Sequence, residues 1–544
     1  MKKYMMLPLV ALGVLSSCVD DKGSYDYTVT NTVTVDNMES TYYAIREITT
    51  LEIEPRIKGD IYGNDLSKYE FTWHVCDRAL AETNHDHTVI GHEPKLVWPV
   101  DMPIGNYTLY FTVKDKETGL EQISSSSLRV TSPFARGFML LGTNGDDDVA
   151  LIDMLSMPSS GDTVMVENAL KNDGMMRKPK EIYFTGTRTG RDNDYMWLFC
   201  EDHSWKLNSI HDDDYAEFDV LGNFASLDIA DNDYGINEDE EECVGIYPHR
   251  SATGMCLSAV QGFLTKDCIY GPASVYGTPY FGVPCNRMAN SSASPLFKFY
   301  PKLFHNTNVY SMRVTSTPIY VYNTDDDVFV MITSGDYLNA THCTTFGSKF
   351  GDAFDLNCRS DDRTLVWGDN TSTPGSAHPH FVMKSVHQPG IWEIYCLKGT
   401  SVYLAPTKEK FTVDLSVARD FDKAEFYSFI GCRRAIFYSV GNILHQYDFQ
   451  RNLHMEMDME APITMVKADY YSVGGRHDNL MVATWDQNAK QGVFMKLEIG
   501  SNPNFLSMEI RNDFDDMVEI EDPSKYTEKW PTRLKIVDAE WRAH

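Results

Sequence analysis

Four tryptophans next to turns are the residues of this chain whose type and position could bind a ligand directly. They are Trp205, Trp367, Trp392 and Trp485. The C–H faces of sugars stack on tryptophan and tyrosine rings that a rigid surface exposes. We therefore expect these four side chains to be candidates for glycan binding. Packing within the protein core is the alternative role for each of them.

Closely spaced histidines are the next candidates, because two histidines at alternate positions of a strand point to the same face. Such pairs suit zinc or copper. Two groups occur: His74, His85, His87 and His92, and then His378 and His380. His85 and His87 fall in a polar loop, and no zincin motif accompanies them. We predict no metal site and no cofactor.

Acidic runs occur at 146–148, 212–214, 238–242 and 325–327. Oxygen-rich loops can bind calcium, but none of these runs has the glycine and terminal glutamate of an EF-hand, so we interpret them as solvated turns. Gly-x-Ser-x-Gly, a phosphate-binding glycine loop and a repeated Asp-box are all absent. The two carboxylates of a glycosidase must lie about 5 to 10 Å apart, which sequence does not establish. No catalytic residue is predicted.

The overall charge restricts the partners of the protein. With 48 Lys plus Arg against 78 Asp plus Glu, the 544 residues carry a formal charge of −30. Binding to the phosphate backbone of a nucleic acid is therefore disfavoured. Hydrophobic residues make up 42% and aromatic residues 12%, which is enough for a packed core.

The N-terminal residues have the pattern of a lipoprotein export signal. Lys2 and Lys3 precede an apolar run that ends at Leu15-Ser16-Ser17-Cys18. We expect residues 1–17 to be a cleaved signal peptide, Cys18 to carry lipid and residues 18–27 to be a polar tether. The alternative is an ordinary cleaved signal with a coincidental cysteine. The run is shorter than the roughly 20 residues of a membrane-spanning helix, so contact with the membrane is expected through the lipid alone.

The cysteine spacing is compatible with disulfides and with free thiols. Passage through an oxidising envelope permits disulfides, and Cys243, Cys256, Cys268 and Cys285 are spaced closely enough to form them. Buried free thiols are the equal alternative.

Residues 28–132 are predicted to form an immunoglobulin-like β-sandwich. Hydrophobic residues alternate at Leu51 to Ile57, at Tyr69 to Val75 and at Tyr107 to Val113, and turn signals separate these segments. Trp73 has the position of a core tryptophan, and Tyr107 follows a Pro-x-Gly turn as a corner tyrosine does. We expect both side chains to pack in the core.

Residues 133–544 are predicted to form a β-propeller-like domain of about seven blades. Hairpins recur, for example at 195–207, 319–332, 436–447 and 480–497, with almost no helical periodicity. Many short strands with polar turns are typical of blades with four strands each. We expect residues 138–152 and the terminal strand around 534–537 to share the blade that closes the ring. A pair of stacked sandwiches is the alternative to this all-β architecture.

Three motifs together resemble the PKD-like lipoprotein family of Bacteroidota. They are the segment from Cys18 to Tyr27, the strand Tyr69-x-Phe71-x-Trp73, and Pro103-x-Gly105-x-Tyr107 followed by Asp115 and Thr118-Gly119. The resemblance covers roughly the first 135 residues. Members are typically encoded beside starch-utilisation-type TonB-dependent transporters, so it implies a lipoprotein of the outer membrane that faces the exterior and assists nutrient capture. It carries over no binding residues.

The sequence thus predicts a non-catalytic surface lipoprotein that binds a glycan or glycoprotein and assists an outer-membrane transporter complex. Two alternatives stay open. One is a surface hydrolase whose carboxylates converge in the channel of the propeller, and the other is a structural or protein-docking module.

Overall fold

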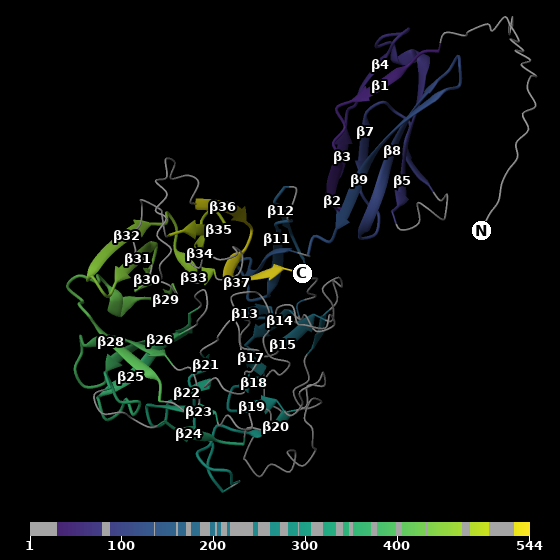
Figure 1. Ribbon diagram of the computed structural model, residues 1–544. Coiled ribbons are helices and arrows are strands. Elements are labelled where there is room, and N and C mark those ends of the chain that lie inside the picture. Colours follow the sequence, from purple (N-terminus) through teal and green to yellow (C-terminus); the bar gives the residue numbers. More distant parts are fainter. Residues whose placement is uncertain are drawn as a thin grey trace, which may run out of the picture. The chain divides into compact units, whose positions relative to one another are not determined.

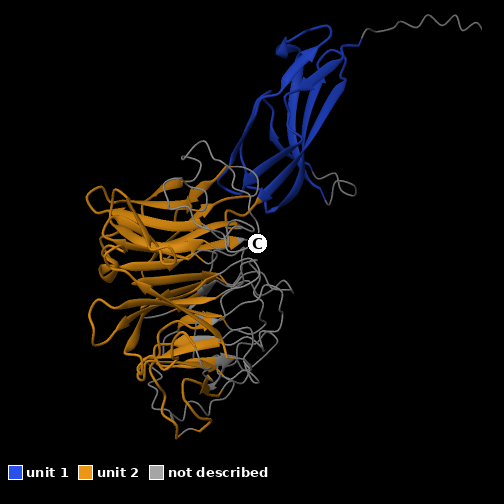
Figure 2. Cartoon of the chain, turned by 60° about the vertical axis from the view of Figure 1, so that its left-hand side comes forward, with its two compact units in different colours: residues 1–130 blue, residues 131–544 orange. Residues whose placement is uncertain are grey.

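A computed structural model gives the fold (Figure 1). It describes residues 30–78, 87–134, 136–158, 162–169, 174, 176–184, 196–201, 204–207, 215–217, 243–247, 262–272, 281–291, 293–305, 319–332, 341–346, 352–371, 378–398, 405–430, 434–469, 479–499 and 527–543. The chain divides into two compact units, Met1–Val130 and Thr131–His544 (Figure 2). Cys18, the tether, His85, Cys256 and the acidic runs at 212–214 and 238–242 lie outside the described residues.

The first unit is a β-sandwich. Its five-stranded sheet has the order β2-β9-β8-β5-β6, and two-stranded sheets pair β1 with β4 and β3 with β7. The strands are β1 (Val33–Asp36), β2 (Thr41–Ile45), β3 (Thr50–Ile53), β4 (Arg56–Gly59), β5 (Tyr69–Asp77), β6 (Thr88–Gly91), β7 (Leu96–Pro99), β8 (Gly105–Asp115) and β9 (Glu121–Thr131).

Trp73 and Tyr107 pack in the core of the sandwich, as predicted. Trp73 has no exposed surface and stacks on Phe111, with ring centroids 4.2 Å apart. The Tyr107 hydroxyl donates a hydrogen bond of 2.7 Å to the carbonyl of Pro103, which satisfies its polar end within the core.

The alternating segment from Leu51 to Ile57 forms two strands rather than one. Leu51, Ile53 and Ile57 are buried as the alternation predicts. The chain nevertheless leaves β3 after Ile53 and begins β4 at Arg56, and the two strands pair in different sheets. Pro55 lies between them and has no N–H for a continuous ladder, which explains the break.

The second unit is a β-propeller of seven four-stranded antiparallel sheets within the described residues. The first sheet has the order β12-β11-β10-β37, and each of the other six consists of consecutive strands. The prediction of about seven blades is confirmed. The early strands are β10 (Arg136–Thr143), β11 (Leu151–Ser156), β12 (Val164–Val166), β13 (Pro179–Phe184), β14 (Met196–Cys200), β15 (Ser204–Leu207), β16 (Tyr215–Glu217), β17 (Cys243–Tyr247), β18 (Gly262–Thr265), β19 (Ile269–Pro272) and β20 (Phe281–Pro284).

Several hairpins of the later blades coincide with those predicted from the sequence. Their strands are β21 (Phe304–His305), β22 (Ile319–Asn323), β23 (Val328–Ile332), β24 (Cys343–Thr345), β25 (Arg363–Asn370), β26 (Pro379–Ser385), β27 (Trp392–Lys398), β28 (Thr407–Val413), β29 (Phe426–Phe429), β30 (Ala435–Val440), β31 (Ile443–Asp448), β32 (Leu453–Asp458), β33 (Ile463–Asp469), β34 (Asn479–Asp486), β35 (Gln491–Glu498), β36 (Thr527–Thr532) and β37 (Lys535–Ala543).

The last strand closes the ring. In Figure 1, β37 (yellow) lies beside the blue strands of the first blade, and it pairs antiparallel with β10 from Arg136↔Ala543 to Thr143↔Lys535. The predicted closing blade is therefore confirmed. Phe138 is fully buried there between Phe494 and Trp541, with ring centroids 5.2 and 4.9 Å away.

Helices are a minor part of the fold. Among the described residues, the labelled helices are the 3-10 turns η1 (Leu66–Lys68) and η7 (Phe421–Lys423). None of the described helices has the length and apolar character needed to span a membrane.

Several described cysteines are buried. Cys285 and Cys343 are free thiols without exposed surface, and the Cys343 Sγ lies 3.3 Å from the Cys285 carbonyl oxygen. Cys268 is also fully buried. The free-thiol alternative therefore holds for Cys285.

The closing contact predicts a stability effect. Phe138→Ala should lower the free energy of unfolding of the propeller by about 3–5 kcal/mol, because a buried aromatic ring is lost from the joint between the first and last strands. Urea unfolding followed by circular dichroism would measure it. Val386→Ala, at a side chain that is 54% exposed, is the control and should change the value by less than about 0.5 kcal/mol. Equal effects of the two substitutions would contradict this role of Phe138.

Candidate functional site

The inner strands of the blades surround a cavity of about 340 Å³. Most of its lining comes from the first strand of five blades (β13, β17, β25, β29 and β33), from the segment just before β21, and from the closing strand β37, and single residues of β14, β18 and β34 complete it. Each blade thus contributes to one axial cavity, as the radial arrangement of a propeller requires. Small-molecule sites typically occupy about 300–1,000 Å³, so this volume suits a small ligand or one end of a larger one.

Charged side chains dominate the polar part of the lining. Six carboxylates and three lysines border the cavity: Glu181, Asp369, Glu425, Asp469, Asp538, Glu540, Lys180, Lys302 and Lys467. Aromatic side chains form much of the rest, namely Tyr183, Phe199, Trp367, Phe426, Tyr427 and Trp541.

Lys467 and the closing strand form the first charged cluster. The Lys467 ammonium donates to Asp538 Oδ1 at 2.9 Å, to the Ala539 carbonyl at 3.0 Å and to Glu540 Oε2 at 3.3 Å. Burial alone would lower the pKa of Lys467, but the two carboxylates outweigh it and raise the pKa. The Ile182 N–H also donates to Asp538 Oδ2 at 3.0 Å. Asp538 and Glu540 are thus the carboxylate partners of the Lys467 ammonium.

Lys302 and Asp369 form the second cluster. Lys302 Nζ lies 2.7 Å from Asp369 Oδ1 and 5.8 Å from the centre of the Trp367 ring. Burial opposes the charge on Lys302, but attraction and hydrogen bonding to Asp369, together with the charges of Glu181 and Tyr300, outweigh it and raise the pKa of the ammonium. Trp367 is half-buried against Tyr427 and Phe429 and borders the cavity. A cation and an aromatic ring therefore lie side by side at the cavity wall.

Glu181 is a cavity carboxylate that takes part in neither of these two clusters. Among the described residues, no hydrogen bond or ion pair within 4.0 Å engages it, although Lys302 and Lys467 attract its charge from farther away. Burial, reinforced by repulsion from Asp538, raises the pKa of Glu181 to about 7 despite these lysines. At neutral pH the carboxyl group therefore exists in both forms, so it can donate or accept a hydrogen bond and can exchange a proton.

The four candidate tryptophans have different surroundings. Trp205, Trp392 and Trp485 are 3%, 9% and 4% exposed and pack within the blades, which is the core-packing alternative. In Trp485 the indole N–H donates to Gln487 at 2.9 Å. Burial leaves these three rings no free face on which a sugar could stack. Trp367 is the one of the four that borders the cavity.

The histidines of the two groups that lie among the described residues have different surroundings. His74 and His87 lie edge to face, with ring centroids 4.7 Å apart, beside Tyr110. His380 is buried, which lowers its pKa to about 3, and its Nδ1 lies 2.9 Å from the carbonyl oxygen of His378. Among the described residues, His445, His454 and Glu456 form the triad whose ligand atoms lie within 4.8 Å of one another.

The described acidic runs are turns. The Asn144 side chain accepts from the backbone N–H groups of Asp146 and Asp147, and Asn323 does the same for Asp325 and Asp326. Lys490 pairs with Asp146 at 2.6 Å. These contacts agree with the interpretation of the two runs as solvated turns.

Sequence reasoning missed the charged residues of the cavity. A usable signal was present in the last strand, where Asp538, Glu540 and Arg542 alternate within a segment predicted to close the ring. Charged residues in a strand that must be buried point to partners inside the fold. Glu181, Lys302 and Lys467 gave no comparable signal, because they come from three different blades and meet only in the closed ring.

Comparison with known proteins identifies the N-terminal part of the chain. The model of the PKD-like family matches residues 18–175. The chain carries a PKD-like family domain. The match extends beyond the sandwich into β10, β11 and β12, which are strands of the first propeller blade. No curated protein matches the chain in sequence.

Several solved structures are similar to this chain at low identity. A quinonprotein alcohol dehydrogenase-like protein from Bacteroides thetaiotaomicron is 11% identical, with 84% of this chain and 91% of that chain covered and a TM-score of 0.37. The extracellular domain of a one-component system from B. thetaiotaomicron is 8% identical, with 75% and 52% covered and a TM-score of 0.33. The WD40 domain of SCAP from fission yeast is 8% identical, with 74% and 76% covered and a TM-score of 0.24.

The raised pKa of Glu181 predicts a pH-dependent stability difference. Folding raises this pKa from 4.5 to about 7, so the folded protein holds the proton more tightly than the unfolded chain does. Stability should therefore fall as the pH rises through this window. The gain in unfolding free energy of Glu181→Gln over the wild type should grow from pH 4.5 to 7 and then level off.

Unfolding by urea at a series of pH values would measure this difference. Glu528→Gln is the matched control, because Glu528 is an exposed carboxylate on the outermost strand β36, paired with Lys496 at 3.2 Å. A pH-independent difference for Glu181→Gln would show that the carboxyl group titrates normally.

Proposed function

We propose that the propeller binds a glycan in its axial cavity. The observation that supports this most directly is the combination of Glu181, Trp367 and Lys302 at one cavity of about 340 Å³. Sugars present hydroxyl groups and apolar C–H faces at the same time. Carboxyl and ammonium groups can bind the hydroxyls, and an indole ring at the wall can pack against a C–H face.

The charged clusters support binding of a neutral or weakly charged ligand. Lys302 and Lys467 are already paired with Asp369, Asp538 and Glu540. These pairs are preorganised donors and acceptors that need no rearrangement to meet hydroxyl groups. Nucleic acid remains disfavoured as a ligand because the cavity contains six carboxylates and three lysines in a protein of charge −30.

The proposal extends to the location and partner of the protein. The lipoprotein pattern at Cys18 and the PKD-like domain support a lipid-anchored protein on the outer face of the outer membrane. A glycan or glycoprotein bound there would be passed to a TonB-dependent transporter complex as nutrient. Contact with the membrane would be through the lipid alone.

A second candidate function is hydrolysis of the bound glycan. The specific observation in its favour is the pKa of Glu181, which burial raises to about 7, as is usual for a general acid. A glycosidase also needs a second carboxylate as base or nucleophile. The carboxylates of Asp369, Asp538 and Glu540 are already paired with lysines, which favours glycan binding over hydrolysis.

Binding to a glycan and mucin-glycoprotein array tests the proposal. Glu181→Gln and Trp367→Ala should each weaken binding at least about tenfold, which is 1.4 kcal/mol of binding free energy. The matched controls are Glu528→Gln and Trp530→Ala on the outermost strand β36, and both should bind normally. Cleaved products that disappear in Glu181→Gln would establish the hydrolase instead. Absence of binding to every glycan would refute the glycan proposal.

The lipid anchor has its own test. Cys18→Ser should abolish incorporation of labelled fatty acid and shift the protein from the membrane fraction to the soluble fraction, because the thioether to the lipid cannot form on serine. Cys76→Ser, at a buried thiol in the sandwich, should leave labelling unchanged. Fatty-acid labelling that persists in Cys18→Ser would contradict the anchor.

A further inference from the structure

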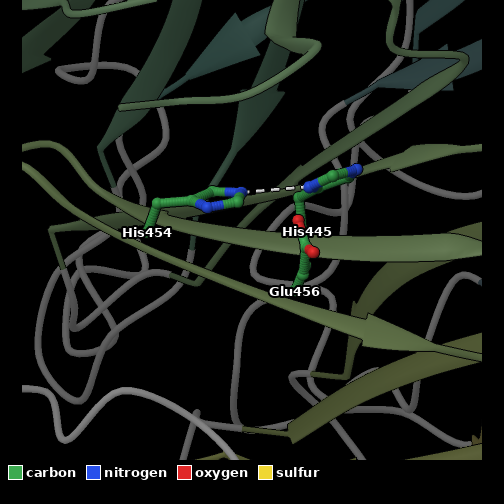
Figure 3. A group of neighbouring side chains, drawn as sticks. All are labelled: His445, His454 and Glu456. Carbon is green, nitrogen blue, oxygen red and sulfur yellow. Dashed lines mark hydrogen bonds between the residues drawn. The ribbon is translucent and has the colours of Figure 1, made fainter. Parts of the chain in front are cut away.

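A second cluster of chemistry-bearing side chains lies in the sixth blade of the propeller, on strands that do not line the axial cavity. His445 is on β31, and His454 and Glu456 are on β32, the outermost strand of that sheet. Figure 3 shows the three side chains together, with the rings of His445 and His454 joined by a dashed line.

The hairpin register brings these residues together. His445 is directly opposite Glu456, and Tyr447 is opposite His454, so His454 is the diagonal neighbour of His445. Opposite and diagonal positions on one face of an antiparallel pair are within side-chain reach. The ligand atoms of the three residues all lie within 4.8 Å of one another.

The spacing of the two ring nitrogens suits a shared ion. His445 Nδ1 and His454 Nε2 are 3.0 Å apart. Two imidazole nitrogens bound to one zinc ion at 2.0–2.1 Å are roughly 3.0 to 3.4 Å apart for angles of about 95 to 110°. The nitrogens are therefore already separated by the distance that coordination requires.

Packing holds the His445 side chain in place. His445 is 3% exposed, and its ring is stacked on Tyr438 with centroids 4.6 Å apart and planes 6° apart. The Tyr438 hydroxyl donates to the Arg419 carbonyl at 2.6 Å, which holds the stacking ring in place. Glu456 is exposed at the other side, so an ion can enter from solvent.

Nearby charges affect the cluster in opposite directions. Arg419 lies 3.5 Å from Glu456, but their side chains are 67% and 48% exposed, and such a surface pair contributes little that an ion would have to replace. Asp420 adds a negative charge that acts on both imidazoles. The hairpin thus offers two nitrogen ligands and one carboxylate, with Arg419 and Asp420 as nearby charges of opposite sign.

We propose that His445, His454 and Glu456 form a binding site for a divalent transition metal ion, with Zn²⁺ as the ion that suits the set best. Two histidines and one glutamate are a recognised zinc ligand set, and imidazole nitrogen disfavours Mg²⁺ and Ca²⁺. Three protein ligands leave a coordination position open for water or for a donor atom of a bound molecule. Without metal, one imidazole N–H donates to the other ring; on binding, that proton moves to the far ring nitrogen and both lone pairs face the ion.

Titration of the chelator-treated full-length protein with Zn²⁺, in competition with a coloured chelator, tests the site. The wild type should bind one equivalent of Zn²⁺. His454→Gln should lower the Zn²⁺ affinity at least about 100-fold, since loss of even an outer-shell partner of a metal lowers the affinity 10- to 100-fold. Glu456→Gln should weaken binding by roughly tenfold or more. Both residues are less buried than His445, so the fold should tolerate these changes.

His387→Gln is the matched control. The His387 ring is 83% exposed and pairs with Asp362, and both residues lie in a different blade from the cluster. This variant should bind Zn²⁺ as the wild type does. With Co²⁺ in place of Zn²⁺, the visible absorption of a four-coordinate ion should appear in the wild type and His387→Gln and be lost in His454→Gln. Equal Zn²⁺ affinity of His454→Gln and the wild type, or binding at millimolar concentration only, would overturn the proposal.

Discussion

Antiparallel pairing of β37 with β10 closes the ring, and the axial cavity depends on that closure. The last strand supplies Asp538 and Glu540, which bind Lys467 of the seventh sheet, while Asp538 also accepts from the Ile182 N–H of the second sheet. One strand thus links both neighbours of the first blade. Without it, the half-buried cation of Lys467 would lose its two carboxylate partners.

The same constraint explains why Glu181 is the chemically distinct group of the cavity. Buried charges are stable only when they are paired, and the lysines are already paired with Asp369, Asp538 and Glu540. The negative charge of Asp538 repels the Glu181 carboxylate, and no described lysine lies within ion-pair distance of Glu181. The ring geometry therefore places a carboxyl group of raised pKa in the same cavity as Trp367 and Lys302, and a ligand that replaces water there gains both polar and apolar contacts.

How far the sequence predicts this protein depends on the range of the interactions involved. Period-two alternation and turn residues are local, and they correctly predicted the sandwich core at Trp73, the hairpins and the closing strand. The alternation from Leu51 to Ile57 does not reveal the break between β3 and β4, although Pro55 lies there and its missing N–H ends the ladder. The burial of Trp205, Trp392 and Trp485 depends on neighbouring blades, which local patterns do not reveal. Glu181, Lys302 and Lys467 come from different blades and meet only in the closed ring, whereas His445 and Glu456 follow from the register of a single hairpin and were predictable in principle.

Hydrogen–deuterium exchange of the protein with and without a bound glycan tests the central claim most directly, because it locates the ligand on the fold. Binding in the axial cavity predicts slower exchange in the inner strands β13, β25, β33 and β37 of separate blades, with the outermost strands unchanged. Protection confined to the sandwich or to outer strands, with the inner strands unaffected, would contradict the account of the axial cavity as the binding site.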